Sequence, residues 1–151
     1  MVNTEQIKQL RAETGISVAQ CKNALEASNG DYAGALDWLK AKGVEIAGKK
    51  GDRQLGAGVI SAYIHAGGSI GVLLELLCET DFVSGNPGFK AVADDLAMHI
   101  AATAPENVEA LLAEDFIKDP SLKIEAVISG ATQKFGERVV LARFSRFAVG
   151  A

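Results

Sequence analysis

The chain has 151 residues, of which 48% are hydrophobic and 23% charged, a balance that excludes an intrinsically disordered protein. Its net charge of −4 argues against the basic surface with which proteins neutralise nucleic-acid phosphates. The sequence has no apolar run of the roughly 18 residues that a membrane-spanning helix needs, and its first five residues lack the features of a secretory signal. We therefore expect a soluble, cytoplasmic protein that contacts neither nucleic acid nor membrane directly.

The charge is distributed unevenly along the chain. Residues 1–55 carry eight basic and seven acidic side chains, whereas residues 56–151 carry seven basic and twelve acidic ones. A polar, glycine-rich stretch, residues 47–53, lies where the balance changes. We predict a first domain over residues 1–50, a linker over 51–56 and a second domain over 57–151.

The first 50 residues predict three short amphipathic helices of about ten residues each. Side chains that cap helix N-termini occur at three places: Asn3 or Thr4, Ser17 and Asp31. Gln20 follows Ser17 by three residues, which is the pattern of a capping box, and Gly15 ends the first helix. Helices this short are unstable alone, so they must pack into a bundle.

From residue 57 onward the hydrophobic pattern changes to the alternation of β-strands. Residues 59–65 alternate, residues 66–69 form a hairpin turn, and residues 70–78 are nearly all aliphatic, as in a central strand. Residues 138–149 form the last strand. We expect one of its faces to carry Val139, Leu141, Arg143, Ser145 and Phe147.

Three helices are predicted between the second and third strands. The first opens at Asn86-Pro87 and ends before Pro105, the second covers residues 106–113, and the third runs from Pro120 to Gly136. The predicted fold class is therefore α+β: a three-helix bundle followed by a three-stranded antiparallel sheet packed with helices.

The central strand predicts an exposed apolar face. Its side chains Leu73 and Leu77 lie opposite the face that carries Val72 and Leu74, and helices can cover only one side of so small a sheet. A large exposed apolar surface usually marks an interface. We hypothesise a homodimer that packs one sheet on another.

The sequence offers little for covalent chemistry. It contains no phosphate-binding loop, dinucleotide fingerprint, paired zinc histidines or nucleophile elbow. His65 and His99 lie 34 residues apart, and the only cysteines, Cys21 and Cys78, are more typical of small buried side chains than of a nucleophile or metal ligand. We predict no cofactor, no metal and no catalytic residue.

One segment, residues 79–88 (ETDFVSGNPG), is unusual. It places Phe82 between an acid and a glycine-containing turn. The ring could pack under the helix that contains Phe89, or it could be exposed at the strand end and anchor a protein partner. The sequence pattern alone leaves both open.

Two long motifs resemble the translation elongation factor Ts family, the nucleotide exchange factors of elongation factor Tu. They are residues 10–25 (LRAETGISVAQCKNAL) and 75–83 (ELLCETDFV). Residues 97–102 (AMHIAA) and 143–147 (RFSRF) also look familial, so the resemblance covers essentially the whole chain. It implies a ubiquitin-associated-like fold for the three-helix domain.

The resemblance also implies a mechanism and two sets of contact residues. The nucleotide domain of elongation factor Tu, in its GDP-bound and nucleotide-free forms, would be contacted by Thr80, Asp81, Phe82 and Val83. The Phe82 ring would be wedged between two helices of that domain. This would disturb the Mg²⁺ site and weaken the binding of GDP. Arg11, Gly15, Val18 and Ala19 would form the contact of the first domain.

The chain departs from the family's pattern at several places, among them Leu77, where asparagine is usual, and Gly85, where a basic residue is common. Residues 17–19 (SVA) stand where methionines are common, and only about ten residues separate Pro105 from Phe116, where single-core members carry several dozen. The chain thus resembles a shortened single-core form, in which pairing of two chains stands in for the second core of long members.

Two other functions remain as alternatives. A ubiquitin-associated-like adaptor would bind its partner through residues 1–55 alone and would not need Phe82. An enzyme would use Cys78 or His99 and would respond to a thiol reagent or a chelator. An exchange factor would instead accelerate GDP release and depend on Phe82.

Overall fold

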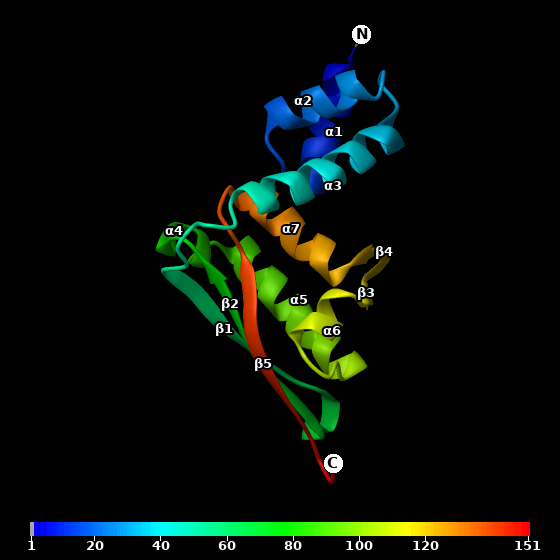
Figure 1. The fold of residues 1–151 in the computed structure, drawn as a ribbon. Helices are drawn as coiled ribbons and strands as arrows, with labels where there is room; N and C mark the ends of the chain where they lie inside the picture. Colours follow the sequence, from blue (N-terminus) through cyan, green and yellow to red (C-terminus); the bar gives the residue numbers. More distant parts are fainter. Residues whose placement is uncertain (1) are drawn as a thin grey trace.

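A computed structural model describes residues 2–151 and shows an α+β protein with an N-terminal helical bundle stacked on one end of a sheet-and-helix core (Figure 1). The bundle consists of α1 (Thr4–Thr14), α2 (Val18–Ala27) and α3 (Tyr32–Lys49). Its buried centre is small and apolar: Leu10, Ile16, Cys21, Ala24, Leu25, Ala35 and Leu39. The three helices that the sequence predicts are therefore present.

The predicted caps form with one change of partner. The side chains of Asn3, Ser17 and Asp31 accept the backbone N–H groups of Glu5, Gln20 and Gly34 at 2.9, 3.3 and 2.8 Å. Gly15 ends α1 in the left-handed region at φ 70°. The capping box is incomplete, because the Gln20 side chain accepts a hydrogen bond from Gln133 of helix α7 instead (2.8 Å).

Helix α3 has 18 residues, longer than the sequence pattern predicts. Its second half leaves the bundle and packs on α7 (Ile124–Phe135), where Gly43 is buried beside Gln133. A methyl group at Gly43 would come within 2.8 Å of the Gln133 side-chain oxygen, so the absence of a side chain permits this close approach. Tertiary packing therefore extends the helix beyond its amphipathic part.

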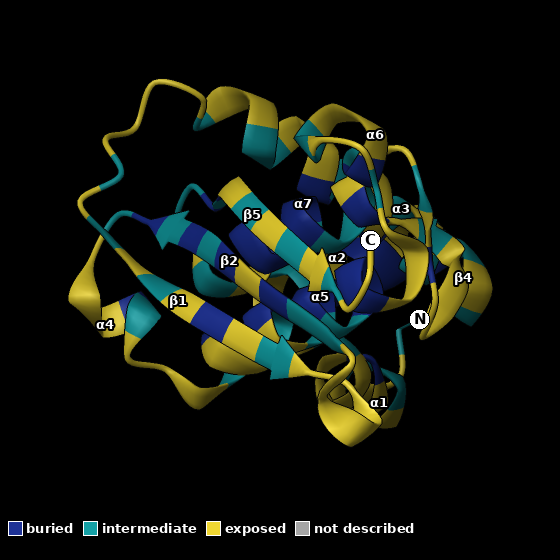
Figure 2. Ribbon diagram, turned by 90° about the horizontal axis from the view of Figure 1, so that it is seen from below, coloured by how far each residue is buried: buried dark blue, intermediate teal, exposed yellow. Residues whose placement is uncertain are grey.

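The core contains a three-stranded antiparallel sheet in the order β1-β2-β5, as predicted. Its strands are β1 (Ala57–Ile64), β2 (Ile70–Cys78) and β5 (Val140–Ala148), and a turn that includes a short 3₁₀ segment, Ala66–Gly68, joins the first two. One face is covered by α5 (Pro87–Thr103), with α7, the one-turn helix α4 (Asp81–Ser84) and α6 (Val108–Leu112) around it. Figure 2 shows more buried and less buried residues alternating along β1 and β2, with the buried sides of α5 and α7 behind them.

The face assignment that we made for the last strand is wrong in part, because β5 contains a bulge. Glu75 pairs with Arg143 whereas Leu76 pairs with Leu141, so Ala142 has no partner on β2. The extra residue switches the faces. Val139 and Leu141 are buried against the helices, whereas Arg143, Ser145 and Phe147 lie on the open side.

The expected start of the last helix is also wrong. Residues 119–123 do not begin a helix at Pro120 but form β4 (Asp119–Lys123), paired with β3 (Asp115–Phe116), and α7 starts at Ile124. The Asp119 carboxylate accepts both the N–H (3.1 Å) and the hydroxyl (2.6 Å) of Ser121. Such local bonds compete with helix formation.

The second face of the sheet is open and partly apolar, as predicted. Ile60, Ile64, Leu73 and Phe147 are exposed on it, and Leu73 in the middle strand is 53% exposed. An ion pair crosses the centre of this face, from Arg143 Nε to Glu75 Oε1 at 3.5 Å. Among the helices of residues 2–151, none is both long and apolar enough to cross a membrane.

Candidate functional site

Phe82 is the most exposed large apolar side chain among the described residues, with 92% of its surface open to solvent. It lies on α4, directly after β2, at the end of the sheet that faces the helical bundle (Figure 1). The reading in which it packs under the next helix is therefore wrong. The ring that fills that position belongs to Phe89, which is fully buried and packs edge-on against Phe135 with centroids 5.8 Å apart.

The predicted contact segment has both an outward and an inward side. Asp81 and Phe82 point into solvent, whereas Val83 is only 9% exposed and belongs to the core cluster. The turn then closes at Gly85, whose N–H donates to the Asp81 carbonyl at 2.9 Å, and Asn86 caps α5 through Gly88 at 2.8 Å. An exposed aromatic side chain is thus presented from a one-turn helix that is anchored on its far side.

Thr80, which precedes α4, is held by a residue distant in sequence. The Glu137 carboxylate accepts the Thr80 backbone N–H (2.9 Å), the Thr80 hydroxyl (2.6 Å) and the Glu79 N–H (3.1 Å). In return, Glu79 Oε2 accepts the backbone N–H of Arg138 at 2.6 Å. Sequence reasoning missed Glu137, because the groups that it binds are mostly backbone N–H groups 57 and 58 residues away.

Two arginine side chains, those of Arg53 and Arg138, lie next to these hydrogen bonds. Arg53 lies 3.4 Å from Glu79 Oε1, and the Arg138 guanidinium donates to the Arg53 carbonyl at 2.9 Å. The segment between α3 and β1 is thereby attached to the residues that precede β5. The Glu79 carboxylate thus bonds to the backbone of Arg138 and to the Arg53 side chain.

The candidate enzyme residues are both buried. Cys78 donates a hydrogen bond to the Thr80 carbonyl (3.3 Å), and burial raises the pKa of its thiol, with the nearby Glu137 carboxylate adding to the rise. His99 accepts the Ile117 N–H at Nδ1 (3.3 Å), which leaves Nε2 to donate to Glu114 (3.2 Å). Both side chains are fully buried, so neither is open to a substrate in this structure.

The four predicted contact residues of the first domain lie around the junction of α1 and α2. Arg11, Gly15, Val18 and Ala19 are all exposed. Gly15 is also close to the core, because a methyl group there would come within 2.7 Å of the Lys134 side chain. All four residues thus lie on the surface of the bundle, on other elements than the helix α4 that carries Phe82.

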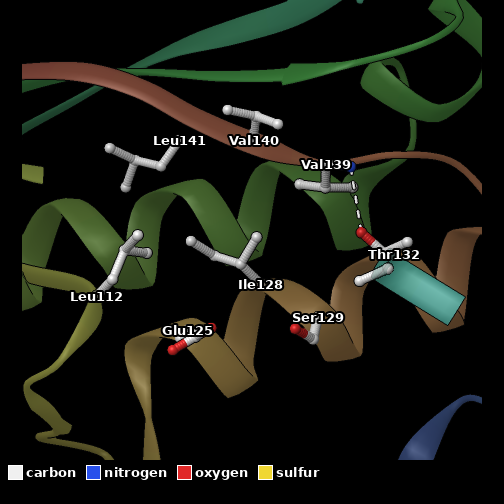
Figure 3. Close-up of a pocket in the computed structure, with 9 residues that line it drawn as sticks. Leu112, Glu125, Ile128, Ser129, Thr132, Val139, Val140 and Leu141 are labelled. Atoms are coloured by element: carbon white, nitrogen blue, oxygen red, sulfur yellow. Dashed lines mark hydrogen bonds between the residues drawn. The ribbon is translucent and has the colours of Figure 1, made fainter. Parts of the chain in front are cut away.

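An apolar hollow of about 200 Å³ lies elsewhere on the core (Figure 3). Ile128 and Thr132 of α7 line it from one side and Leu141 of β5 from another, and the Thr132 hydroxyl accepts the Val139 N–H at 3.1 Å. It contains none of the predicted contact residues. In the part of the chain that the structure describes, three or more metal-ligating side chains converge nowhere.

Comparison with known proteins identifies one family. The family model described as elongation factor TS matches residues 52–109 and 79–151. The chain is 40% identical to elongation factor Ts of Nostoc sp. over 148 residues, which is 98% of this chain but 47% of that relative. It is 35% identical to elongation factor Ts of Thermodesulfovibrio yellowstonii and 34% identical to that of Herpetosiphon aurantiacus, with 99% of this chain and 96% and 98% of the relatives covered.

The chain is shorter than the relatives that it matches from end to end. The alignment with the Thermodesulfovibrio protein extends over 193 positions, against 151 residues in this chain. Those relatives therefore carry residues without a counterpart here.

Proposed function

The chain belongs to the elongation factor Ts family, and we propose that it promotes the release of GDP from elongation factor Tu by inserting Phe82 near the Mg²⁺ and phosphate site of that partner. The observation that carries the proposal is the exposure of Phe82 on a helix anchored by Val83. Exposing a phenyl ring to water is unfavourable unless a partner covers it. A single buried aromatic anchor contributes about 2–4 kcal/mol to a protein interface.

The mechanism needs no covalent step, so we propose a non-catalytic exchange factor without a cofactor of its own. Mg²⁺ and the phosphate-binding loop hold GDP, and a ring inserted beside them displaces the ion and weakens the nucleotide. Linkage makes the effect reciprocal: a factor that weakens GDP binding is itself bound more weakly by the GDP form. Incoming GTP then displaces the factor.

Asp81 and Phe82 are the proposed direct contacts, whereas Thr80 and Val83 hold them in place. This division rests on burial and bonding, since Val83 packs in the core and Thr80 bonds to Glu137. The site is thus a small outward surface with a rigid support behind it.

A second contact is proposed for the first domain, residues 1–50, as a ubiquitin-associated-like unit joined by the linker 51–56 to the core domain 57–151. Arg11, Gly15, Val18 and Ala19 would bind the same nucleotide domain. Their common exposure around the start of α2 supports this assignment. We place the protein in the cytoplasm, where translation elongation takes place.

The open sheet face supports a homodimer as the working unit. Its exposed apolar side chains Ile60, Leu73 and Phe147 would be covered by the same face of a second chain, in the isologous manner of a two-fold interface. The Glu75–Arg143 pair at the centre would give such an interface its register.

The proposal is tested with elongation factor Tu loaded with fluorescent GDP and mixed with an excess of unlabelled nucleotide. The protein is expected to accelerate release in a saturable manner, and added GDP is expected to weaken the complex of the two proteins. A release rate that stays at its intrinsic value at all factor concentrations would contradict the proposal. A fragment of residues 1–55 that binds as well as the whole chain, with Phe82 dispensable, would favour the adaptor alternative.

A further inference from the structure

Two dipeptides, Glu79-Thr80 and Glu137-Arg138, form reciprocal carboxylate-to-backbone hydrogen bonds across the end of the sheet. Each glutamate accepts backbone N–H groups of the other dipeptide: Glu137 takes those of Glu79 and Thr80, and Glu79 takes that of Arg138. Hydrogen bonds to an ionised carboxylate are stronger than those between neutral groups. The junction between β2 and α4 is therefore attached to the junction between α7 and β5 by four bonds, the Thr80 hydroxyl included.

This arrangement replaces the usual helix cap. Thr80 is the N-cap residue of α4, a position where a threonine hydroxyl normally accepts a helix N–H group, but here its side chain makes no such bond. The hydroxyl donates to Glu137 instead, at 2.6 Å. Thr80 is thus oriented from outside α4.

Helix α4 cannot fix its own direction. It has four residues, too few for a helix to be stable by itself. Two attachments hold it: Thr80, the residue that precedes the helix, bonds to Glu137, and Val83 within the helix packs in the core. Phe82 projects between these two attachments, so a change at either one changes the direction of the ring.

We propose that Glu137 is a positioning residue for Phe82: its carboxylate fixes the backbone of Thr80 and thereby holds the ring in the direction that the partner site needs. This inference rests on the proposed function, because it assigns a role to the same wedge. Holding a binding group in its bound conformation before contact removes the cost of ordering it during contact. Glu137 therefore acts through Phe82 and touches neither nucleotide nor Mg²⁺.

The test compares the full chain with Glu137→Ala, Glu137→Gln, Phe82→Ala and the double variant Phe82→Ala/Glu137→Ala in the GDP-release assay, at increasing factor concentration. Glu137→Ala is expected to lower the maximal release rate about tenfold, with a smaller change in the half-saturating concentration. Glu137→Gln is expected to keep most of the rate, because its amide oxygen still accepts N–H groups and its NH₂ donates to the Thr80 hydroxyl. Glu106→Ala, which removes an exposed carboxylate in a bend, is the matched control and should match the wild type.

The double variant separates positioning from general damage. If Glu137 acts through Phe82, its removal has no further effect once the ring is absent. Hydrogen exchange at the Thr80 amide is expected to be faster in Glu137→Ala than in the wild type. Should Glu137→Ala not fold, Thr80→Val, which removes only the hydroxyl bond, is expected to lower the rate about threefold.

The outcomes are distinct. A wild-type rate for Glu137→Ala, or a further tenfold loss in the Phe82→Ala background, would overturn the positioning role while leaving the exchange function intact. If Glu137→Ala does not fold, an unchanged rate in Thr80→Val would likewise overturn the positioning role. A wild-type protein that does not accelerate GDP release would overturn the proposed function, and this inference with it.

Discussion

The open sheet face gives a quantitative prediction for Leu73, the exposed leucine in the middle of β2. Leu73 is 53% exposed, so a second sheet would bury about half of a side chain whose full burial is worth roughly 1.5–3 kcal/mol. A two-fold interface contains the residue twice, so loss of its burial costs about 2 kcal/mol and raises the dimer dissociation constant about thirtyfold. Leu73→Glu adds two carboxylates beside Glu75 and is expected to weaken the dimer further.

Sedimentation velocity over the micromolar range measures this directly. The wild type is expected to sediment as a dimer, and Leu73→Glu as a monomer with unchanged far-ultraviolet circular dichroism. Val44→Glu is the matched control, because Val44 is exposed on α3, away from the sheet, and gains the same charge. A monomeric wild type, or a Leu73→Glu variant that stays dimeric at the same concentrations, would exclude a dimer through this face of the sheet.

Two further predictions concern stability and ionisation. Phe89→Ala is expected to lower the free energy of unfolding by about 3–5 kcal/mol, because the ring is fully buried against Phe135, and urea denaturation measures this; a loss under about 1 kcal/mol would contradict the packing. The hydrogen bond from Tyr32 to Glu13 raises the pKa of Tyr32 to about 12. Since the folded value exceeds the unfolded one, this contribution to stability is present below pH ~10 and is lost as the pH rises towards 12. In an ultraviolet titration, Glu13→Ala should return the pKa of Tyr32 towards its ordinary value, and no change would count against the bond.

The local features of the fold and the central place of the aliphatic strand in the sheet could be predicted from the sequence, whereas the details of long-range pairing and packing could not. The caps at Asn3, Ser17 and Asp31 depend on bonds within three residues, which the sequence displays directly. The bulge at Ala142 depends on how β5 pairs with β2, and the hydrophobic alternation of one strand does not reveal it. The same holds for the length of α3, which its packing on α7 determines.

The candidate site divides in the same way. The position of Phe82 between a buried strand and a turn is visible in the sequence, but its exposure is not. Either Phe82 or the nearby Phe89 could fill the core under α5, and the sequence does not show that Phe89 does so. No sequence pattern around Glu137 indicates its role, because its partners Glu79 and Thr80 are distant in sequence and bond to it mainly through their backbone N–H groups. Glutamate next to a helix-ending glycine is too common a pattern to indicate such a role.

The proposed exchange function depends most on Phe82, and one comparison tests it directly. Fluorescent GDP release from elongation factor Tu is measured by stopped flow with the wild type, Phe82→Ala and the exposed control Ile117→Ala. Phe82→Ala is expected to fold normally and to lose at least about thirtyfold in stimulated release, corresponding to roughly 2 kcal/mol, whereas Ile117→Ala is expected to behave as the wild type. A Phe82→Ala variant that stimulates release as well as the wild type would contradict the wedge.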